Sequence, residues 1–192
     1  MIRAISFDFY GVMYTNFDWT VINQRIYSDE AKHEEFRQLI KAANDGAIGN
    51  ETFRHKTAEL AADSEYPDSP AVLVDPVVNT ALMDYARELR ATKQELKLAI
   101  LSNGGKEHVG GVLQEFQIYD EFDLIATSAE LPCYKPEPAA FRYVAETFGI
   151  EMAELLHVDD SPRHIEGAEQ AGVKGLLYTD MQSLRAAIDS LE

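Results

Sequence analysis

The chain has 192 residues, of which 46% are hydrophobic and 26% charged, as is typical of a globular protein with a buried core. Its 33 acidic and 17 basic side chains give a net charge of -16, which disfavours binding to nucleic acid or anionic membranes. A single cysteine, Cys133, excludes an internal disulfide. No apolar run approaches the roughly 18 residues of a membrane span, and the N-terminus has no signal-peptide cleavage pattern, so we expect a cytoplasmic protein without membrane partners.

Short apolar segments alternate with helical patterns along most of the chain. Five segments are typical of buried strands: residues 2–7, 93–102, 122–126, 155–158 and 175–178. Helical patterns follow at residues 106–117, 136–148, 162–171 and 181–191. This alternation predicts an α/β fold with a Rossmann-like parallel sheet flanked by helices on both faces.

Residues 15–89 interrupt this alternation. Segments 20–43 and 50–62 are predicted to be helices, with Asn50 as a candidate cap of the second. Residues 64–78 contain three prolines and are predicted to be irregular, and a helical stripe through Leu82 and Leu89 leads back to the sheet. We therefore expect a catalytic core of residues 1–14 and 90–192, with an inserted helical cap of residues 15–89.

Polar residues follow three of the predicted strands directly. Asp8 ends the first strand, Ser102 and Asn103 end the second, and Asp159 and Asp160 end the fourth. In an open parallel sheet, ligands bind outside the carboxyl ends of the strands. The sequence therefore predicts a functional site at this edge of the sheet.

The residue types at this edge suit group transfer. Asp8, beside a glycine turn with free backbone N–H groups, can act as a nucleophile. Ser102 and Asn103 offer a hydroxyl and an amide to substrate oxygens. Lys135, just before a predicted helix, can neutralise a nucleophile and a phosphoryl group, although by itself it is more typical of a surface lysine.

The acidic residues also predict a metal site. Carboxylates of Asp8, Asp159 and Asp160 that meet at one edge would repel one another, and hard oxygen ligands in this arrangement favour Mg²⁺. The alternative is that the Asp159–Asp160 pair caps the helix that starts near Pro162.

Together these residues resemble the four sequence motifs of the haloacid dehalogenase superfamily. Asp8, Ser102, Lys135 before Pro136, and Asp159–Asp160 occur in the family's order, and residues 15–89 resemble its small α-helical cap. The resemblance implies a hydrolase with Asp8 as nucleophile, which forms an aspartyl-phosphate in phosphatase members. It also implies that Ser102 and Lys135 bind the phosphoryl group. Asp8, Asp160 and the backbone carbonyl of Tyr10 would then hold Mg²⁺.

Tyr10 departs from the phosphatase pattern. Phosphatase members carry a second aspartate at this position as general acid and base, whereas hydrolytic dehalogenases carry a tyrosine. The pair Asp159–Asp160 instead favours a metal-dependent phosphatase, because metal-free dehalogenases have uncharged residues at these positions. The alternative to a catalytic role for Tyr10 is that its side chain packs between cap and core. His164, four residues after Asp160, is either a supporting partner of Lys135 or a helix residue that faces solvent.

Three functions remain open at this point. The first is a Mg²⁺-dependent phosphatase that acts on a small phosphorylated metabolite. The second is a 2-haloacid dehalogenase-like hydrolase, which would need a cap arginine for the substrate carboxylate: Arg25, Arg37 or Arg54. The third is a catalytically weak binding protein with the same fold. Four aromatic residues could line the cap entrance: Tyr14, Phe17, Trp19 and Tyr27.

Overall fold

The computed structural model describes residues 1–15, 23–44, 47–62, 77–128, 130–131 and 133–190. The chain forms two compact units. The first, called the core unit, comprises Met1–Tyr14 and Val78–Glu192, and the second, called the helical unit, comprises Thr15–Val77. None of the helices in the described residues is long and apolar enough to cross a membrane.

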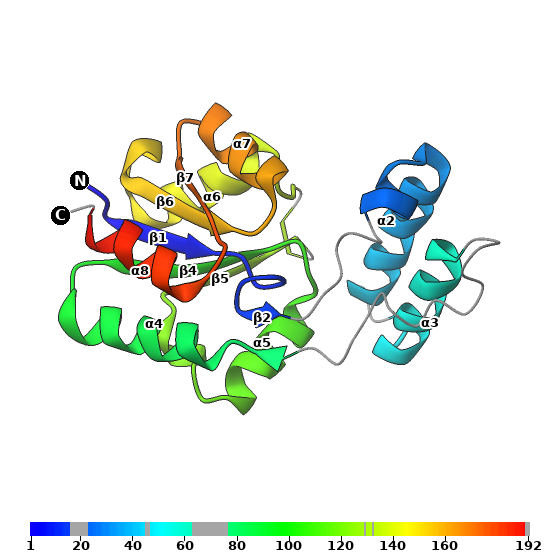
Figure 1. Cartoon of the computed structure of the whole chain (residues 1–192), viewed down its shortest axis with the longest axis horizontal. Helices are drawn as coiled ribbons and strands as arrows, with labels where there is room; N and C mark the ends of the chain where they lie inside the picture. The colour runs from blue at the N-terminus through cyan, green and yellow to red at the C-terminus, as the bar shows by residue number, and fades with distance from the viewer. Residues whose placement is uncertain (16–22, 45–46, 63–76, 129, 132, 191–192) are drawn as a thin grey trace. The chain divides into compact units, whose positions relative to one another are not determined.

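The core unit is built on a five-stranded sheet with the strand order β5-β4-β1-β6-β7 (Figure 1). Each neighbouring pair of strands runs parallel. The strands are β1 (Ala4–Phe7), β4 (Lys97–Ser102), β5 (Leu124–Thr127), β6 (Leu155–Asp159) and β7 (Lys174–Leu177). The predicted Rossmann-like parallel sheet is thus confirmed, with bounds that differ from the expected ones by a few residues.

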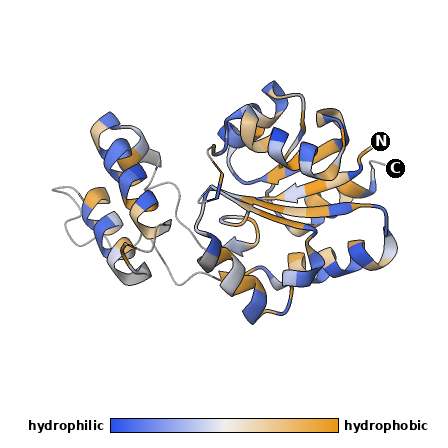
Figure 2. Cartoon of the chain, turned by 180° about the vertical axis from the view of Figure 1, so that it is seen from behind, coloured by the Kyte–Doolittle hydropathy of each residue, from blue (hydrophilic) through white to orange (hydrophobic). Residues whose placement is uncertain are grey.

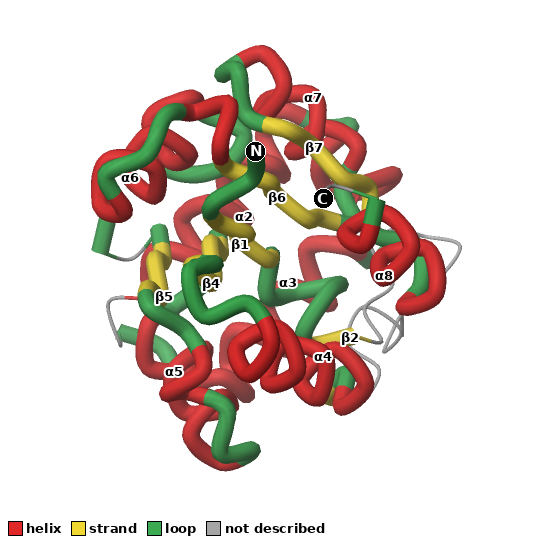
Figure 3. The backbone as a smooth tube through the Cα atoms, turned by 90° about the vertical axis from the view of Figure 1, so that its left-hand side faces the viewer, coloured by secondary structure: helices red, strands yellow, loops and turns green. Residues whose placement is uncertain are grey.

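Two layers of helices bury the faces of the sheet, because successive side chains of a strand point to opposite sides. Ile5 and Phe7 of β1 join an apolar cluster with α4 (Thr80–Thr92), α5 (Lys106–Glu115) and α8 (Met181–Asp189). Ala4 joins a second cluster with α6 (Pro138–Phe148) and α7 (Pro162–Gln170). Figure 2 shows the apolar strands between helices with polar outer faces, and Figure 3 shows the sheet between the two layers.

Helix α4 lies in the core unit, whereas we expected the cap to extend to residue 89. Its buried residues, Leu82, Met83, Tyr85, Ala86 and Leu89, pack into the cluster that contains Phe7. The helix begins where Asn79 Oδ1 accepts a hydrogen bond from the Leu82 N–H at 3.2 Å. The apolar stripe was therefore read correctly as a helix but placed in the wrong unit.

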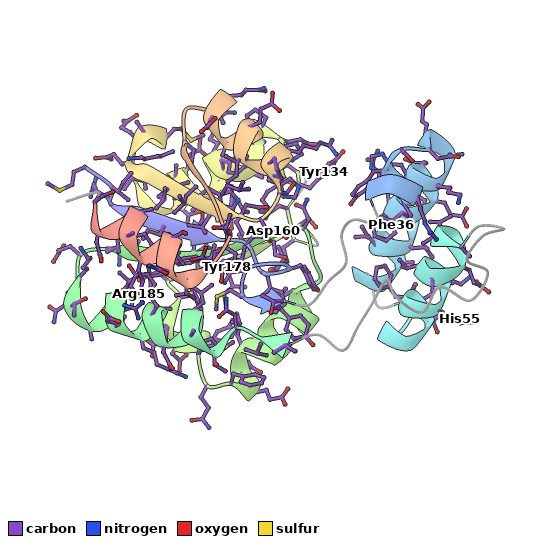
Figure 4. The ribbon with its side chains drawn as sticks, viewed as in Figure 1. Phe36, His55, Tyr134, Asp160, Tyr178 and Arg185 are labelled. Atoms are coloured by element: carbon purple, nitrogen blue, oxygen red, sulfur yellow. The ribbon has the colours of Figure 1, made fainter. Side chains whose placement is uncertain are left out.

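The helical unit contains a π-helical turn, η1 (Asn23–Tyr27), and the helices α2 (Glu30–Asn44) and α3 (Asn50–Ala61). Its small core consists of Ile26, Phe36 and Ala61, and Figure 4 labels Phe36 on α2. Residues 20–22 of the expected helix 20–43 lie outside the described residues.

Two helix starts in this unit differ from expectation. Helix α2 starts at Glu30, because Asp29 Oδ1 accepts from the backbone N–H groups of Ala31 (2.9 Å) and Lys32 (3.1 Å) and so caps the helix there. Asn50 is the first residue of α3 and Gly49 takes the cap position, so the prediction of Asn50 as a cap was wrong.

Most of the expected irregular segment 64–78 also lies outside the described residues. Its last two residues form β3 (Val77–Val78), which pairs with β2 (Tyr14–Thr15) in a two-stranded sheet. Both strands stand where the chain passes between the two units. Two short 3₁₀ turns, Tyr119–Glu121 and Met152–Glu154, precede β5 and β6.

The packing of α7 on the segment after Lys135 can be tested at Gly167. A Cβ atom there would contact the Cβ of Pro136 and lie 2.6 Å from its carbonyl oxygen. We expect Gly167→Ala to lower the free energy of unfolding by about 1–3 kcal/mol in urea titrations, because backbone must move. Gly111→Ala, in α5 with no described atom within 4 Å, should raise it by about 0.5–1 kcal/mol. Equal stability of the two variants would contradict this packing.

Candidate active site

A buried lysine bridges two buried aspartates at the carboxyl end of the sheet. Lys135 Nζ lies 2.8 Å from Asp8 Oδ1 and 2.6 Å from Asp159 Oδ2. The side chains of Lys135 and Asp159 are 0% exposed and that of Asp8 is 8% exposed. Lys135 therefore joins Asp8 at the end of β1 to Asp159 at the end of β6, as expected from their positions after the predicted strands.

The backbone fixes Asp8 at the end of β1. Its N–H donates to the Val158 carbonyl at 2.8 Å, which continues the pairing of β1 with β6 by one residue. Its Oδ1 accepts a 2.6 Å hydrogen bond from the Phe9 N–H, in addition to the contact with Lys135. Both contacts fall on the same oxygen, so Oδ2 is the oxygen that can meet a ligand.

Asn103 holds the segment that carries Lys135. Its Nδ2 donates to the Lys135 carbonyl at 2.8 Å, and its Oδ1 accepts from the Lys135 N–H at 2.8 Å. We expected this amide to bind substrate. The structure instead shows both ends of the amide bonded to the backbone of one residue, which places Lys135 relative to the end of β4.

Asp159 is surrounded by donors from the protein. Its Oδ1 accepts from the Ser161 N–H at 2.9 Å and from His164 Nδ1 at 3.0 Å. Its Oδ2 accepts from Lys135 Nζ and, at 3.1 Å, from His157 Nε2. The oxygens predicted to bind a metal are thus already occupied by protein donors.

These contacts shift the pKa values of the cluster in opposite directions. Burial would raise the pKa of Asp159, but Lys135 and the two imidazoles hold it well below its usual range. The pKa of Asp8 is raised, because burial and the neighbouring Asp159 outweigh the attraction of Lys135. Burial lowers the pKa of His157 to about 4, so this ring is neutral near pH 7.

Asp160 lies against the loop that follows β1. Its carboxylate packs against Gly11, where a Cβ atom would collide with it, and Gly11 has a φ of +91°. Figure 4 labels Asp160 in the core unit, after the end of β6. Burial and the charge of Asp159 raise the pKa of Asp160 to about 6. Within the described residues, Asp160 has no ion-pair partner among the lysines and arginines.

Ser102 and Tyr10 both lie close to Gly104. A Cβ atom at Gly104 would lie 3.1 Å from both Ser102 Oγ and Tyr10 Oη and 2.5 Å from Tyr10 Cε2. Ser102 is 1% exposed, and its Oγ finds no hydrogen-bond partner in the part of the chain that the structure describes. A buried hydroxyl without a partner costs free energy unless a ligand supplies one.

Tyr10 is a partly buried ring rather than an acid or base. Its ring packs edge-on against Phe9, with 5.0 Å between the centroids. Burial and the nearby charge of Asp8 raise the pKa of its phenol above its usual value. The hydroxyl therefore stays protonated and can donate a hydrogen bond, but it cannot act as a base near pH 7.

His164 contacts Asp159 and not Lys135 itself. Its Nδ1 lies 3.0 and 3.1 Å from the two oxygens of Asp159, and its side chain is 20% exposed. Ligand atoms of Asp8, Asp159 and His164 all lie within 4.8 Å of one another, which would suit a metal ion. The Lys135 ammonium already supplies the cation between the two aspartates, so we assign no metal to that position.

The predicted cap residues are only partly described. Tyr14 lies in β2 and stacks on Phe9, with 5.4 Å between centroids, and Tyr27 packs edge-on against Phe36 in the helical unit. Arg25 donates to the Ala61 carbonyl at 3.3 Å, and Arg37 pairs with Glu34 at 3.3 Å. Phe17, Trp19 and the side chain of Arg54 lie outside the described residues.

Two buried polar residues of the site were missed from the sequence. Ser6 and His157 are 0% exposed and lie opposite each other in the register of β1 and β6. Both stand inside otherwise apolar strands, and polar residues at such positions indicate a partner. The sequence therefore indicates that Ser6 and His157 have polar partners, but it does not indicate which residues these partners are.

The chain belongs to the haloacid dehalogenase-like hydrolases, because the model of that family matches residues 2–172. It is 33% identical over 124 residues to a phosphoglycolate phosphatase of Pseudomonas putida, a match that covers 60% of this chain and 45% of that protein. It is 35% identical over 85 residues to haloacetate dehalogenase H-2 of a Moraxella species, which covers 44% of this chain and 38% of that protein. The chain thus spans less than half the length of these relatives.

Other similarities extend over the whole chain. Phosphatase MT3486 of Mycobacterium tuberculosis is 26% identical over 222 residues, which covers 98% of this chain and 97% of that protein. The crystal structure of a HAD family enzyme, bt-2542 of Bacteroides thetaiotaomicron, in complex with magnesium and inorganic phosphate, matches with a TM-score of 0.62. It is 24% identical and covers 96% of this chain and 99% of that one. This likeness shows a shared fold.

Removal of the Lys135 charge should destabilise the protein in a pH-dependent way. In Lys135→Met, two buried carboxylates lose their cation, so their pKa values rise in the native state. Near neutral pH the native state then binds more protons than the unfolded state. Stability should then fall as pH rises above the usual carboxyl range. We expect a loss of about 3–5 kcal/mol in urea titrations at pH 8, and a smaller loss at pH 5.

A double variant provides the control. Lys135→Met/Asp159→Asn removes one uncompensated charge and should recover part of the stability at pH 8. A loss in Lys135→Met that is independent of pH would show that methionine simply packs badly there.

Proposed function

We propose that the protein is a Mg²⁺-dependent phosphatase that hydrolyses a small phosphorylated metabolite through an aspartyl-phosphate on Asp8. The observation that carries the proposal is the buried hydroxyl of Ser102, which has no hydrogen-bond partner among the described residues. It lies at the same sheet edge as the Lys135 ammonium beside Asp8. A phosphoryl group has the acceptor oxygens that this hydroxyl and this ammonium need.

In the first step, the ionised Asp8 Oδ2 attacks phosphorus, the bond from phosphorus to the leaving oxygen breaks, and the leaving oxygen takes a proton from solvent. Lys135 and Ser102 stabilise the phosphoryl oxygens during this transfer by a charge-assisted and a neutral hydrogen bond. In the second step, water attacks phosphorus of the aspartyl-phosphate and loses a proton to solvent, and the bond from phosphorus to Asp8 Oδ2 breaks, which releases inorganic phosphate and restores the Asp8 carboxylate. The Tyr10 hydroxyl, protonated near Ser102, is placed to donate a hydrogen bond at the same edge.

The residues present fit Mg²⁺. Asp160 is a desolvated carboxylate with no ion-pair partner in the described part of the chain, and it packs on the loop that carries Tyr10. Asp8, Asp160 and the Tyr10 carbonyl would hold the ion, and all three offer the hard oxygens that it prefers. When bound, it would neutralise charge on the phosphoryl group. The sequence predicts Asp159 as a further metal ligand, but because protein donors surround its oxygens we propose that it positions Lys135 instead.

Relatives support this choice among hydrolases. The Pseudomonas putida protein is a phosphoglycolate phosphatase, and the Bacteroides thetaiotaomicron enzyme binds magnesium and inorganic phosphate. We therefore propose phosphoglycolate and other small phosphate esters as the first substrates to assay.

A 2-haloacid dehalogenase-like activity is the second candidate, because Tyr10 and the Moraxella relative favour it. It would need a cation for the substrate carboxylate. Arg25 and Arg37 are bonded within the helical unit, and the charge of Asp160 would repel a haloacid. We therefore place this activity behind phosphatase activity.

Replacement of the nucleophile tests the mechanism. Asp8→Asn should reduce phosphate release from p-nitrophenyl phosphate and phosphoglycolate to the uncatalysed background, because the amide cannot form the phosphorylated intermediate. Asp120→Asn, on an exposed turn, should keep the wild-type rate. Retained activity in Asp8→Asn would reject the aspartyl-phosphate. Halide release from chloroacetate in the presence of EDTA would favour the dehalogenase-like activity. No turnover of the phosphate esters or of chloroacetate would favour a binding protein.

Metal binding can be read from stability as well as from activity. Because burial raises the pKa of Asp160 to about 6, the metal-free native state loses stability as pH rises through that value. Without metal, Asp160→Asn should therefore be more stable than wild type by about 2 kcal/mol at pH 7.5, and the difference should shrink to less than half of this at pH 4.5. Saturating Mg²⁺ should raise the unfolding temperature of the wild type and of Asp120→Asn, but not that of Asp160→Asn. An equal rise in all three would remove Asp160 from the metal site.

A further inference from the structure

Ser6 and His157 lie beneath the reacting groups without touching them. They are the third residues of β1 and β6, and they face each other in the parallel pairing of these strands. Both side chains point into the apolar layer formed with α6 and α7, where the His157 ring packs edge-on against Phe141 at 5.1 Å between centroids. The reaction proposed above uses neither residue.

Hydrogen bonds connect these two residues to the Lys135 ammonium. Ser6 Oγ lies 2.9 Å from His157 Nδ1, and His157 Nε2 lies 3.1 Å from Asp159 Oδ2. The same Oδ2 accepts from Lys135 Nζ at 2.6 Å, and Lys135 Nζ also contacts Asp8 Oδ1 at 2.8 Å. A continuous chain thus runs from the centre of the sheet to the nucleophile.

The chemistry of the partners gives this chain a direction. An ionised carboxylate only accepts hydrogen bonds, so His157 Nε2 must carry the proton. In the neutral ring, Nδ1 then has a lone pair, so the Ser6 hydroxyl donates to it at 2.9 Å. The Ser6 carbonyl also lies 3.2 Å from Nδ1, but in this tautomer Nδ1 has no proton to donate to it. Each polar atom is satisfied, and the ring is locked by bonds at both nitrogens and by Phe141. An apolar side chain would fill this position without the cost of burying an imidazole, so the fold by itself does not require one.

These hydrogen bonds matter because the side chains of Lys135 and Asp159 could otherwise rotate. A lysine ammonium is a point charge on a flexible stem with three rotatable donors, and it has no preferred direction of its own. The Asp159 carboxylate sets that direction only if it cannot rotate. The Ser161 N–H and His164 hold Oδ1, while His157 holds Oδ2, so the carboxylate plane is fixed from both ends.

We propose that Ser6 and His157 are positioning residues, which act through Asp159 to hold the Lys135 ammonium in the orientation that meets the transferring phosphoryl group. This inference rests on the proposed function, because the contact between Lys135 and the phosphoryl group is part of it. A displacement of about 1 Å in such a contact can lower a rate by about 10²-fold.

Kinetics of matched variants test the role. His157→Phe removes both nitrogens, whereas His157→Gln keeps an amide N–H near the place of Nε2. Leu155→Ala, on the same face of β6 and in the same apolar cluster, is the control for lost packing. With p-nitrophenyl phosphate below the unfolding temperature of each variant, His157→Phe should lower kcat by about 10- to 100-fold with little change in KM. His157→Gln should recover most of the loss, Ser6→Ala should show a smaller loss, and Leu155→Ala should keep the wild-type kcat.

A spectroscopic readout does not depend on turnover. In ¹⁵N-labelled full-length protein, the wild type should show one protonated and one unprotonated ring nitrogen for His157, and a slowly exchanging ammonium signal for Lys135. His157→Phe should broaden or abolish the ammonium signal, and Leu155→Ala should keep it.

Two results would overturn the proposal: an unchanged Lys135 signal in His157→Phe, or an equal loss of kcat in Leu155→Ala. If the wild type shows no turnover at all, the proposed function fails. The spectra then still decide whether His157 holds Lys135.

Discussion

The site depends on one ammonium group that is buried between two carboxylates. Two acids and one base without solvent would be costly to bury if any oxygen or proton lacked a partner. The surroundings of Lys135 meet this demand: Asn103 fixes its backbone, and His157 and His164 complete the shell around Asp159. Burial and the charge of Asp159 leave Asp8 with a raised pKa, and the net negative charge of the cluster makes a further cation favourable.

The two adjacent aspartates at the end of β6 have different surroundings because a strand turns alternate side chains to opposite sides. Asp159 points into the layer shared with α6 and α7, where protein donors surround it. Asp160 points to the loop after β1, where it packs against Gly11 and has no ion-pair partner among the described residues. One acid therefore organises the protein, while its neighbour remains available to a ligand.

The sequence was informative wherever a feature was local. Apolar runs that end in polar residues predicted the strands and the edge at which Asp8, Lys135 and Asp159 meet, since strand ends in a parallel sheet share one side. It was not informative where a side chain bonds to a distant segment. The amide of Asn103 suited a substrate as well as the backbone of Lys135, and only the fold decides between them. Likewise, the burial of α4 in the core follows from its packing, which an amphipathic stripe alone does not reveal.

Asn79 has a consequence beyond the start of α4. Its N–H donates to the Met13 carbonyl at 2.9 Å, and its side-chain amide donates to the Val12 carbonyl (3.0 Å) and the Tyr178 hydroxyl (2.8 Å). One residue thus anchors the outgoing chain, the returning chain and the end of β7 within the core unit. All of these contacts lie within the core unit, so the two points at which the chain leaves and re-enters it are held together by the core unit itself.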